Sequence, residues 1–267
     1  MTISHSMIMF RGAPEFDAAA VERHIRTCWP PEHRSVQVTV EDGTLSVRWD
    51  GNETDLLVAT VIDAPMPWDE VQGYCERSDF WADAEATLRP HDSHVIAVAR
   101  GIQEPADVMR LLTLLTSAIV TTVDGALGVL WSPAEHVLPA GIFTEVTPEL
   151  LADETFVCHL WVNVRTGWSG EGVSNGCTTG LAHLGLMEVE TKDAPEEPAD
   201  LRNRFQNIVI YLLRNGLVIA DGDSLGRSMD ERIDAVYADS LFGADDRTIQ
   251  LQFAPKPAKK RWWGLLN

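Results

Sequence analysis

The sequence predicts an α+β fold with two similar halves, each α/β and sandwich-like, in which helices pack on mixed or antiparallel sheets. Short segments that alternate apolar and polar residues indicate strands, and turn residues such as Asp42-Gly43 separate them. Segments with apolar residues three and four positions apart indicate helices. A strand–helix–strand order occurs twice, and each helix begins with the same tetrapeptide, Glu-Pro-Ala-Asp. Together these patterns favour helices packed on mixed or antiparallel sheets.

The first half, residues 1–132, begins with a strand, a helix and an antiparallel meander. Val21, Ile25 and Cys28 recur on one face of the first helix, and Pro30-Pro31 ends it. Strands are expected at 6–10, 36–40, 44–49 and 55–62, and helices at 14–29 and 67–77.

The repeated order indicates duplication of a small α/β unit. Each repeat has a strand, a helix that opens with the tetrapeptide at Glu104 or Glu197, a glycine stop and a second strand. The strands are expected at 94–100 and 126–131 in the first repeat, and at 186–191 and 217–220 in the second. A single domain that uses the βαβ arrangement twice is the alternative.

The remaining segments complete the predicted organisation. Residues 133–155, rich in Pro and Glu, form the predicted connection, and residues 156–254 form the second half. In that half, strands are expected at 156–165, 235–239 and 248–253, and a long glycine-rich loop at 167–185. Residues 255–267 form a basic tail that contains tryptophan.

Charge is the strongest functional indicator. The chain has 40 acidic and 21 basic residues, for a net charge of −19, and the tail holds four of the basic residues and no acid. The rest of the chain therefore carries 17 basic and 40 acidic residues, or −23. Such a body repels nucleic acid and anionic membranes and attracts cationic surfaces.

The cellular location of the protein and the redox state of its cysteines are predicted from the apolar segments and the cysteine spacing. No secretory signal is evident, and the most apolar segment, 108–123, is interrupted by Arg110 and reads as a buried helix, so no stable membrane insertion is expected. The cysteines Cys28, Cys75, Cys158 and Cys177 form no CxxC pair and are expected to be reduced thiols. These features predict a cytoplasmic protein.

No cofactor, metal site or catalytic set is predicted. The glycine-rich loop lacks the Lys of a phosphate-binding loop. Cys177 and His183 leave a nucleophile–base pair open as an alternative, but no third orienting residue is identifiable. Asp221 and Asp223 resemble a paired-aspartate metal signature, yet Asp and Gly in a tight turn are favoured for backbone reasons alone.

Two acidic clusters, 186–200 and 221–246, indicate a surface that binds a basic protein partner. A solvated charged face is the alternative. Trp168 in the glycine-rich loop is a candidate apolar anchor, since interface energy concentrates in a few aromatic or Arg residues. The predicted partner-binding residues are Asp221, Asp223, Glu196, Glu197, Trp168 and Glu171.

The tail combines its four basic residues with Trp262, Trp263, Leu265 and Leu266. It could touch a membrane surface weakly, or dock on a partner or on the protein's own acidic body. A disordered terminus is the remaining alternative.

A family resemblance lies in the last third of the chain. The motifs that carry it are Thr179-Gly180-Leu181, Leu184-Gly185, Glu188-Val189-Glu190, Tyr211-Leu212-Leu213, Asn215-Gly216, Asp221-Gly222-Asp223-Ser224-Leu225-Gly226 and Ser228. Their order resembles the bacterial family known as domain of unknown function 4261, over about residues 178–253. The resemblance implies a bacterial cytosolic protein encoded near toxin or contact-dependent secretion genes, and it supplies no catalytic residue.

The function expected is therefore that of a non-enzymatic immunity protein. It would neutralise a cognate bacterial toxin, such as a nuclease effector of a type VI secretion system, by occluding its cationic active site. A chaperone or adaptor for a secreted effector is the first alternative. A hydrolase that uses the glycine-rich loop is the second. The oligomeric state stays open.

Overall fold

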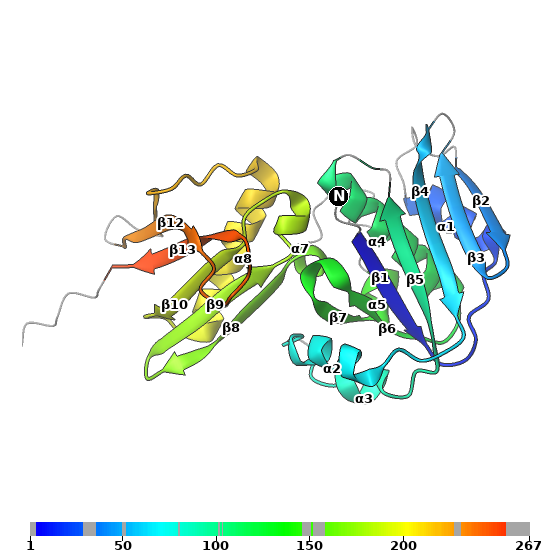
Figure 1. Ribbon diagram of the computed structural model, residues 1–267, viewed down its shortest axis with the longest axis horizontal. Helices are drawn as coiled ribbons and strands as arrows, with labels where there is room; N and C mark the ends of the chain where they lie inside the picture. The colour runs from blue at the N-terminus through cyan, green and yellow to red at the C-terminus, as the bar shows by residue number, and fades with distance from the viewer. Residues whose placement is uncertain are drawn as a thin grey trace, which may run out of the picture.

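The computed structural model describes residues 4–28, 36–49, 52–79, 81–100, 102, 104–145, 151, 158–226 and 231–254. The chain folds as two adjacent units, each built on one sheet, and the class is α+β as predicted (Figure 1). The basic tail 255–267 lies outside the described residues.

The first sheet, over the described part of the chain, has seven strands in the order β2-β3-β4-β5-β1-β6-β7. All neighbouring pairs are antiparallel. The strands are β1 (Ser4–Phe10), β2 (Val36–Glu41), β3 (Thr44–Trp49), β4 (Asn52–Ile62), β5 (Ser93–Arg100), β6 (Ala126–Trp131) and β7 (His136–Pro139). The predicted meander is thus confirmed as β2–β3–β4.

Helices cover both faces of this sheet. Helices α1 (Ala18–Cys28) and α4 (Pro105–Thr122) pack on one face, where Ile8 and Phe10 join the main core. Helices α2 (Trp68–Glu76) and α3 (Ala84–Leu88) pack on the other face, where Met9 joins a smaller cluster. The side chains of β1 alternate between the two cores because successive strand residues point to opposite faces.

The first unit extends beyond the boundary predicted at residue 132. A short 3₁₀ turn, η2 (Ser132–Ala134), leads into β7, and α5 (Ala140–Glu145) follows. Strand β7 pairs with β6 at the edge of the first sheet, and α5 packs against α4. Most of the described part of the predicted connection is therefore structure of the first unit.

The second sheet has six strands within the described residues, in the order β11-β12-β13-β10-β9-β8. It is mixed, because β10 and β13 run parallel while the other pairs are antiparallel. The strands are β8 (Asn163–Gly170), β9 (Val173–Thr179), β10 (Val189–Ala194), β11 (Ser224–Leu225), β12 (Ile233–Asp239) and β13 (Arg247–Phe253).

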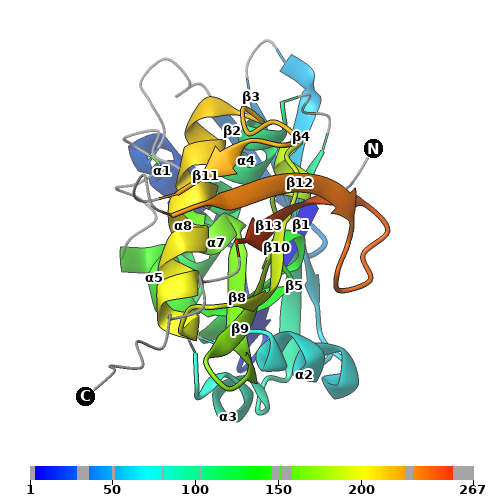
Figure 2. The same ribbon diagram turned by 90° about the vertical axis from the view of Figure 1, so that its left-hand side faces the viewer.

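Helix α8 (Pro198–Asn215) lies along one face of the second sheet (Figure 2). Its buried side chains are Leu201, Arg204, Phe205, Val209, Leu212 and Leu213. A Cβ atom placed on Gly176 of β9 would lie 3.1 Å from Leu201 and 3.2 Å from Phe205. Glycine at this position therefore allows the helix to pack close to the strand.

Two predicted elements of the second half that precede α8 are wrong, and a third, the strand expected at 217–220, is taken up below. The strand expected at 156–165 is instead a short helix, α7 (Cys158–Trp161), followed by β8, and residues 156–157 lie outside the described part. Most of the loop expected at 167–185 is the hairpin β8–β9, followed by the 3₁₀ turn η3 (Ala182–Leu184). Gly172, at φ +71°, forms the turn after Glu171, so the glycines shape a hairpin and not an open loop.

The repeated tetrapeptide begins a helix in both units, as predicted. Glu104 and Glu197 are the N-cap residues of α4 and α8, and each helix has 18 residues with Pro in its first turn. The two units share this plan of a long helix on a sheet, while their strand orders differ. Residues 217–220 form no strand, because the chain leaves α8 through Gly216 and makes an irregular crossing to β11.

Buried contacts join the two units. Trp161 Nε1 donates a hydrogen bond to Thr113 Oγ1 of α4 at 2.9 Å, and His136 Nε2 donates to the Leu160 carbonyl at 3.0 Å. Core side chains of both sheets form one continuous cluster through this region. In the part of the chain that is described, no helix is long and apolar enough to cross a membrane.

Candidate functional site

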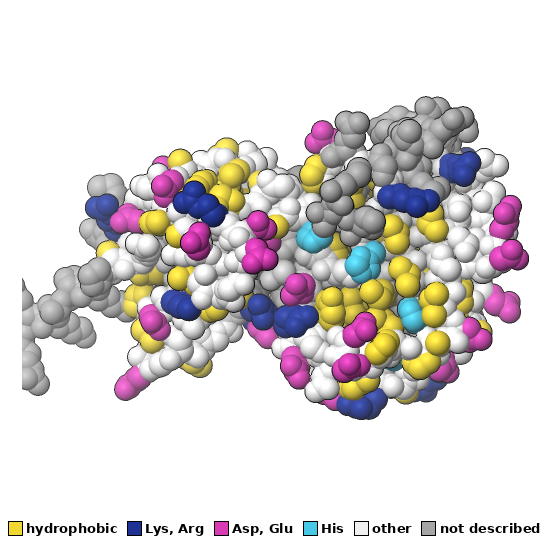
Figure 3. Space-filling model, viewed as in Figure 1, with side chains coloured by type: hydrophobic (Ala, Val, Ile, Leu, Met, Phe, Trp, Pro, Cys, Tyr) yellow, Lys and Arg dark blue, Asp and Glu magenta, His cyan; other side chains and the backbone are white. Residues whose placement is uncertain are grey.

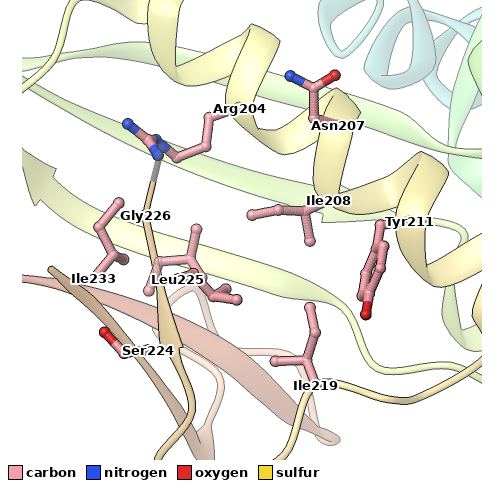
Figure 4. A pocket seen from close by; sticks show the side chains of 10 residues that line it. Arg204, Asn207, Ile208, Tyr211, Ile219, Ser224, Leu225, Gly226 and Ile233 are labelled. Carbon is pink, nitrogen blue, oxygen red and sulfur yellow. The ribbon is translucent and has the colours of Figure 1, made fainter. Parts of the chain in front are cut away.

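A groove lies between α8 and the β11 edge of the second sheet. Arg204, Asn207, Ile208 and Tyr211 line one wall, at the spacing that places them on one face of the helix. The opposite wall and floor are formed by Ile219, Ser224, Leu225, Gly226, Ile233 and Leu251. The groove encloses about 340 Å³, and Figure 4 shows Ile208, Leu225 and Ile219 turned toward its centre.

Exposed apolar residues occur in the groove and in the chain just before Ile219, which lines it. Tyr211 is 49% exposed, and Leu217 and Val218, which follow α8, are 43% and 47% exposed. Large apolar residues gathered at one place on a surface commonly mark an interaction site. Apolar pockets with a few polar groups are also the usual form of ligand sites, and this one falls at the small end of their range of about 300–1,000 Å³.

One end of the groove is fixed by Arg204, whose side chain is only 7% exposed. Its guanidinium donates to Glu196, with Nε 3.1 Å from Oε2, and to Glu231, with Nη2 2.6 Å from Oε1. Burial disfavours the charged guanidinium, but the hydrogen bonds and charges of the two carboxylates outweigh it and raise the pKa of Arg204. Two carboxylates around one cation leave this end of the groove with excess negative charge.

The turn before β11 lies in the chain between Ile219 and Ser224, which both line the groove. Asp221 Oδ1 accepts a hydrogen bond from the Tyr237 amide at 2.8 Å, and Asp223 Oδ2 accepts one from the Ala220 amide at 2.7 Å. Both aspartates therefore stabilise the turn by accepting hydrogen bonds from backbone amides, which is the role that Asp commonly has in a tight turn. They remain exposed and place negative charge beside Ile219 and Ser224.

The segment of the chain that forms this groove matches a known protein family. Residues 177–252 match the family described as a domain of unknown function (DUF4261). The match confirms the resemblance expected in the last third of the chain. All the residues that line the groove fall inside the matched segment. Neither the comparison with curated proteins nor that with solved structures gave a match.

The six predicted partner-binding residues do not form one site. Trp168, 59% exposed, and Glu171 belong to the β8–β9 hairpin, and β8 is one edge of the sheet. Asp221 and Asp223 adjoin β11, the opposite edge. Glu197 is exposed at the start of α8, whereas Glu196 is held by Arg204. Of these six, the two aspartates are the exposed carboxylates beside the groove.

The predicted acidic surface is smaller than the sequence indicates, because several of its carboxylates are internal. Glu188 accepts hydrogen bonds from Thr178 Oγ1 at 2.6 Å and from the Gly180 amide at 2.8 Å, and burial raises its pKa. Glu190, 4% exposed, accepts from Ser240 Oγ and the Leu241 amide. The exposed acids are spread over both units on the face seen in Figure 3.

The structure does not activate the proposed nucleophile. Burial raises the pKa of the Cys177 thiol, although Arg165 opposes this shift. A thiol with a raised pKa stays protonated at neutral pH and is a poor nucleophile. His183 Nδ1 lies 3.4 Å from Ser4 Oγ of the first unit, and the pKa of His183 is lowered by burial.

The other cysteines are also unactivated. Cys28 Sγ lies 3.4 Å from His24 Nε2 on α1, but burial raises the pKa of the thiol. Burial likewise raises the pKa of Cys75, to about 11, and of Cys158. Within the described ranges, no three His, Cys, Asp or Glu side chains are placed to hold a metal ion.

The groove residues on α8 are the part of the site that sequence reasoning missed. Ile208 is only partly buried, because it packs against the main core on one side and lines the groove on the other. The available signal was the width of the apolar face. Ile208 and Tyr211 make the apolar face of α8 wider than the face that packs on the sheet, and the additional width lines the groove.

Proposed function

We propose that this protein is a binding protein that neutralises a bacterial toxin in the cytoplasm, and that the groove beside α8 is its docking site. The observation that carries the proposal is an open apolar groove with acidic residues at its rim, inside the segment that matches the family. Interfaces between proteins commonly combine a buried apolar centre with a polar rim.

The groove supplies the apolar centre. Tyr211 is the candidate anchor because it is aromatic, lines the groove and is half-exposed. Leu217 and Val218 add apolar surface beside it. A partner side chain that enters the groove would lose contact with water and contact Ile208 and Leu225, which favours binding.

The charge of the molecule defines the chemistry of the partner. The chain outside the tail carries −23, and Asp221 and Asp223 place exposed carboxylates next to the groove. A toxin that cleaves nucleic acid has a cationic active cleft, because it must hold phosphates. Opposite charges speed the association of two proteins and set their orientation, so such a cleft is a suitable target.

The mechanism proposed is occlusion. The apolar groove would bind a projecting side chain of the toxin, while the acidic rim would pair with Lys or Arg around the toxin's active cleft. No chemical step is required of the protein, which agrees with the raised pKa of its thiols.

Co-expression with a candidate nuclease toxin from the genes next to that of this protein tests the proposal. The wild-type chain should restore growth, and Tyr211→Lys should lose most of the protection, because it removes the aromatic anchor and places a positive charge where the cationic partner docks. Val40→Lys is the matched control, since Val40 is a 36% exposed apolar residue on β2 of the first unit. Growth restored equally by all three proteins, or by none, would refute docking at this groove.

A second candidate is a chaperone or adaptor for a secreted effector, and the apolar character of the groove favours it. Such a protein would bind an extended segment of its client through apolar contacts. Salt distinguishes the two functions. Association with a cationic toxin should slow as salt rises, whereas apolar docking of a segment should not.

A further inference from the structure

The chain leaves the described part of the structure at the end of the groove. Phe253 of β13 pairs with Ile233, which lines the groove, and the Phe253 ring lies 5.6 Å from the Arg204 guanidinium carbon. The Ala254 amide donates a hydrogen bond to the Arg232 carbonyl at 3.2 Å. Residues 255–267 therefore continue from a point beside the Arg204 end of the groove.

The composition of this tail complements the groove. Four basic residues precede or adjoin a tryptophan pair and two leucines, and no acid is present. These residues are Lys256, Lys259, Lys260, Arg261, Trp262, Trp263, Leu265 and Leu266. Adjacent tryptophans offer a large apolar area with a polar N–H, which suits a half-open groove.

We propose that the tail 255–267 of each molecule binds the groove of the same molecule, with the Trp262-Trp263 pair against Ile208, Tyr211 and Leu225. The basic residues then lie near the acidic rim. This inference goes beyond the proposed function, because it concerns the free protein and needs no toxin. Only one consequence rests on the proposed function, namely that the tail competes with a partner for the groove.

The length of the tail is sufficient. Trp262 lies eight positions after Ala254, and an extended chain spans about 3.3–3.6 Å per residue, so the reach is roughly 26–29 Å. The α8 wall from Arg204 to Tyr211 is about 10 Å long at 1.5 Å per residue. The tryptophans can therefore reach any part of the groove, even along a curved path.

Charge favours the same arrangement. Glu196 and Glu231 exceed the charge of Arg204 at the near end of the groove, and Asp221 and Asp223 lie beside Ser224 on the other wall. A tail with four positive charges is attracted to both regions. Attachment to the same chain also gives the tail a local concentration in the millimolar range, so a weak contact suffices to fill the groove.

Nuclear magnetic resonance of the full chain tests the inference. Trp262→Ala/Trp263→Ala should shift the backbone amide signals of Ile208, Tyr211 and Leu225, because it empties the groove. Trp262→Phe/Trp263→Phe is the matched control and should leave these signals near their wild-type positions. Unchanged groove signals in the alanine variant, or changes confined to other surfaces, would overturn the proposal.

A synthetic peptide of residues 255–267 provides the second measurement. The peptide should bind the alanine variant at least tenfold more tightly than the wild-type chain, because the wild-type groove is already occupied. Adding Tyr211→Lys to the alanine variant should abolish the binding of the peptide. Equal affinity for both chains, or no binding, would overturn the proposal. Sedimentation should give the same mass for both proteins. A wild-type dimer that the alanine variant loses would instead assign the groove to the tail of a second copy.

Discussion

Arg204 fixes the geometry of one end of the groove. Its guanidinium joins the segment before α8, through Glu196, to the segment before β12, through Glu231. A buried cation between two carboxylates is costly to remove, because the carboxylates then face each other without compensation. The groove therefore depends on a side chain that makes its main contacts inside the protein.

We predict that Arg204→Ala lowers the free energy of unfolding by roughly 3 kcal/mol, the lower end of the range for breaking a buried ion pair. Chemical denaturation measures this loss. Arg232→Ala is the control, because Arg232 pairs with Asp234 at an exposed site, and its unfolding midpoint should not change measurably. Equal stability of Arg204→Ala and the wild type would show that the network contributes little.

His136 gives a pH-dependent prediction. Burial lowers its pKa from the ordinary 6.5 to about 4, although the hydrogen bond to the Leu160 carbonyl opposes this shift. The unfolded chain therefore binds a proton that the folded chain does not, and stability is lost as the pH falls from about 6.5 to 4. Between pH 7 and pH 5 the expected loss from this group is about 2 kcal/mol.

The comparison of wild type with His136→Gln isolates that contribution from the other titrating groups. Urea unfolding at pH 7 and pH 5 should show a smaller loss on acidification for His136→Gln, since glutamine does not titrate. An identical loss in both proteins would mean that His136 is protonated equally in the folded and unfolded states.

The burial of several acidic residues could not be predicted from the sequence. Glu188, Glu190 and Glu196 look like members of a solvated acidic cluster, yet each is bonded to partners inside the fold. Their burial depends on contacts with strands and loops distant along the chain. Asp221 and Asp223 were easier to interpret, because turn chemistry is local.

Helix α8 and the β8–β9 hairpin are the elements that build the second unit. The start of α8 was predictable from Glu197 and Pro198, since helix-initiating residues act locally. The hairpin was not, because glycine in a strand and glycine in a loop look alike in sequence. Gly176 belongs to a strand that a helix covers closely, which only the packing reveals.

This packing predicts different outcomes for two glycines of the same hairpin. Gly176→Val should lower stability by about 1–3 kcal/mol, because the added side chain meets Leu201 and Phe205. Gly167→Val should change stability little, since no atom lies within 4 Å of a Cβ at that position. Thermal or chemical unfolding of the two variants provides the check, and equal losses would refute close packing of α8 on β9.

In the molecule as a whole, the fold class and the strands of the first sheet other than β7 were predictable from sequence, because alternating and helical periodicity reflect burial directly. The sequence did not predict the groove. The groove arises where the irregular crossing 217–223 carries the chain from α8 to the sheet edge, and β11, with only two residues, leaves the wall beside Tyr211 uncovered. Such a surface depends on the order of strands in the sheet.

The groove, assisted by the acidic body, is proposed to bind a cationic protein. The most direct test is the association rate of the purified toxin with the wild type, Tyr211→Lys and Val40→Lys, each at low and moderate salt. We expect fast association that slows as salt rises for the wild type and Val40→Lys, and greatly weakened binding for Tyr211→Lys. Equal binding by all three proteins, independent of salt, would show that neither the groove nor the acidic body guides the association.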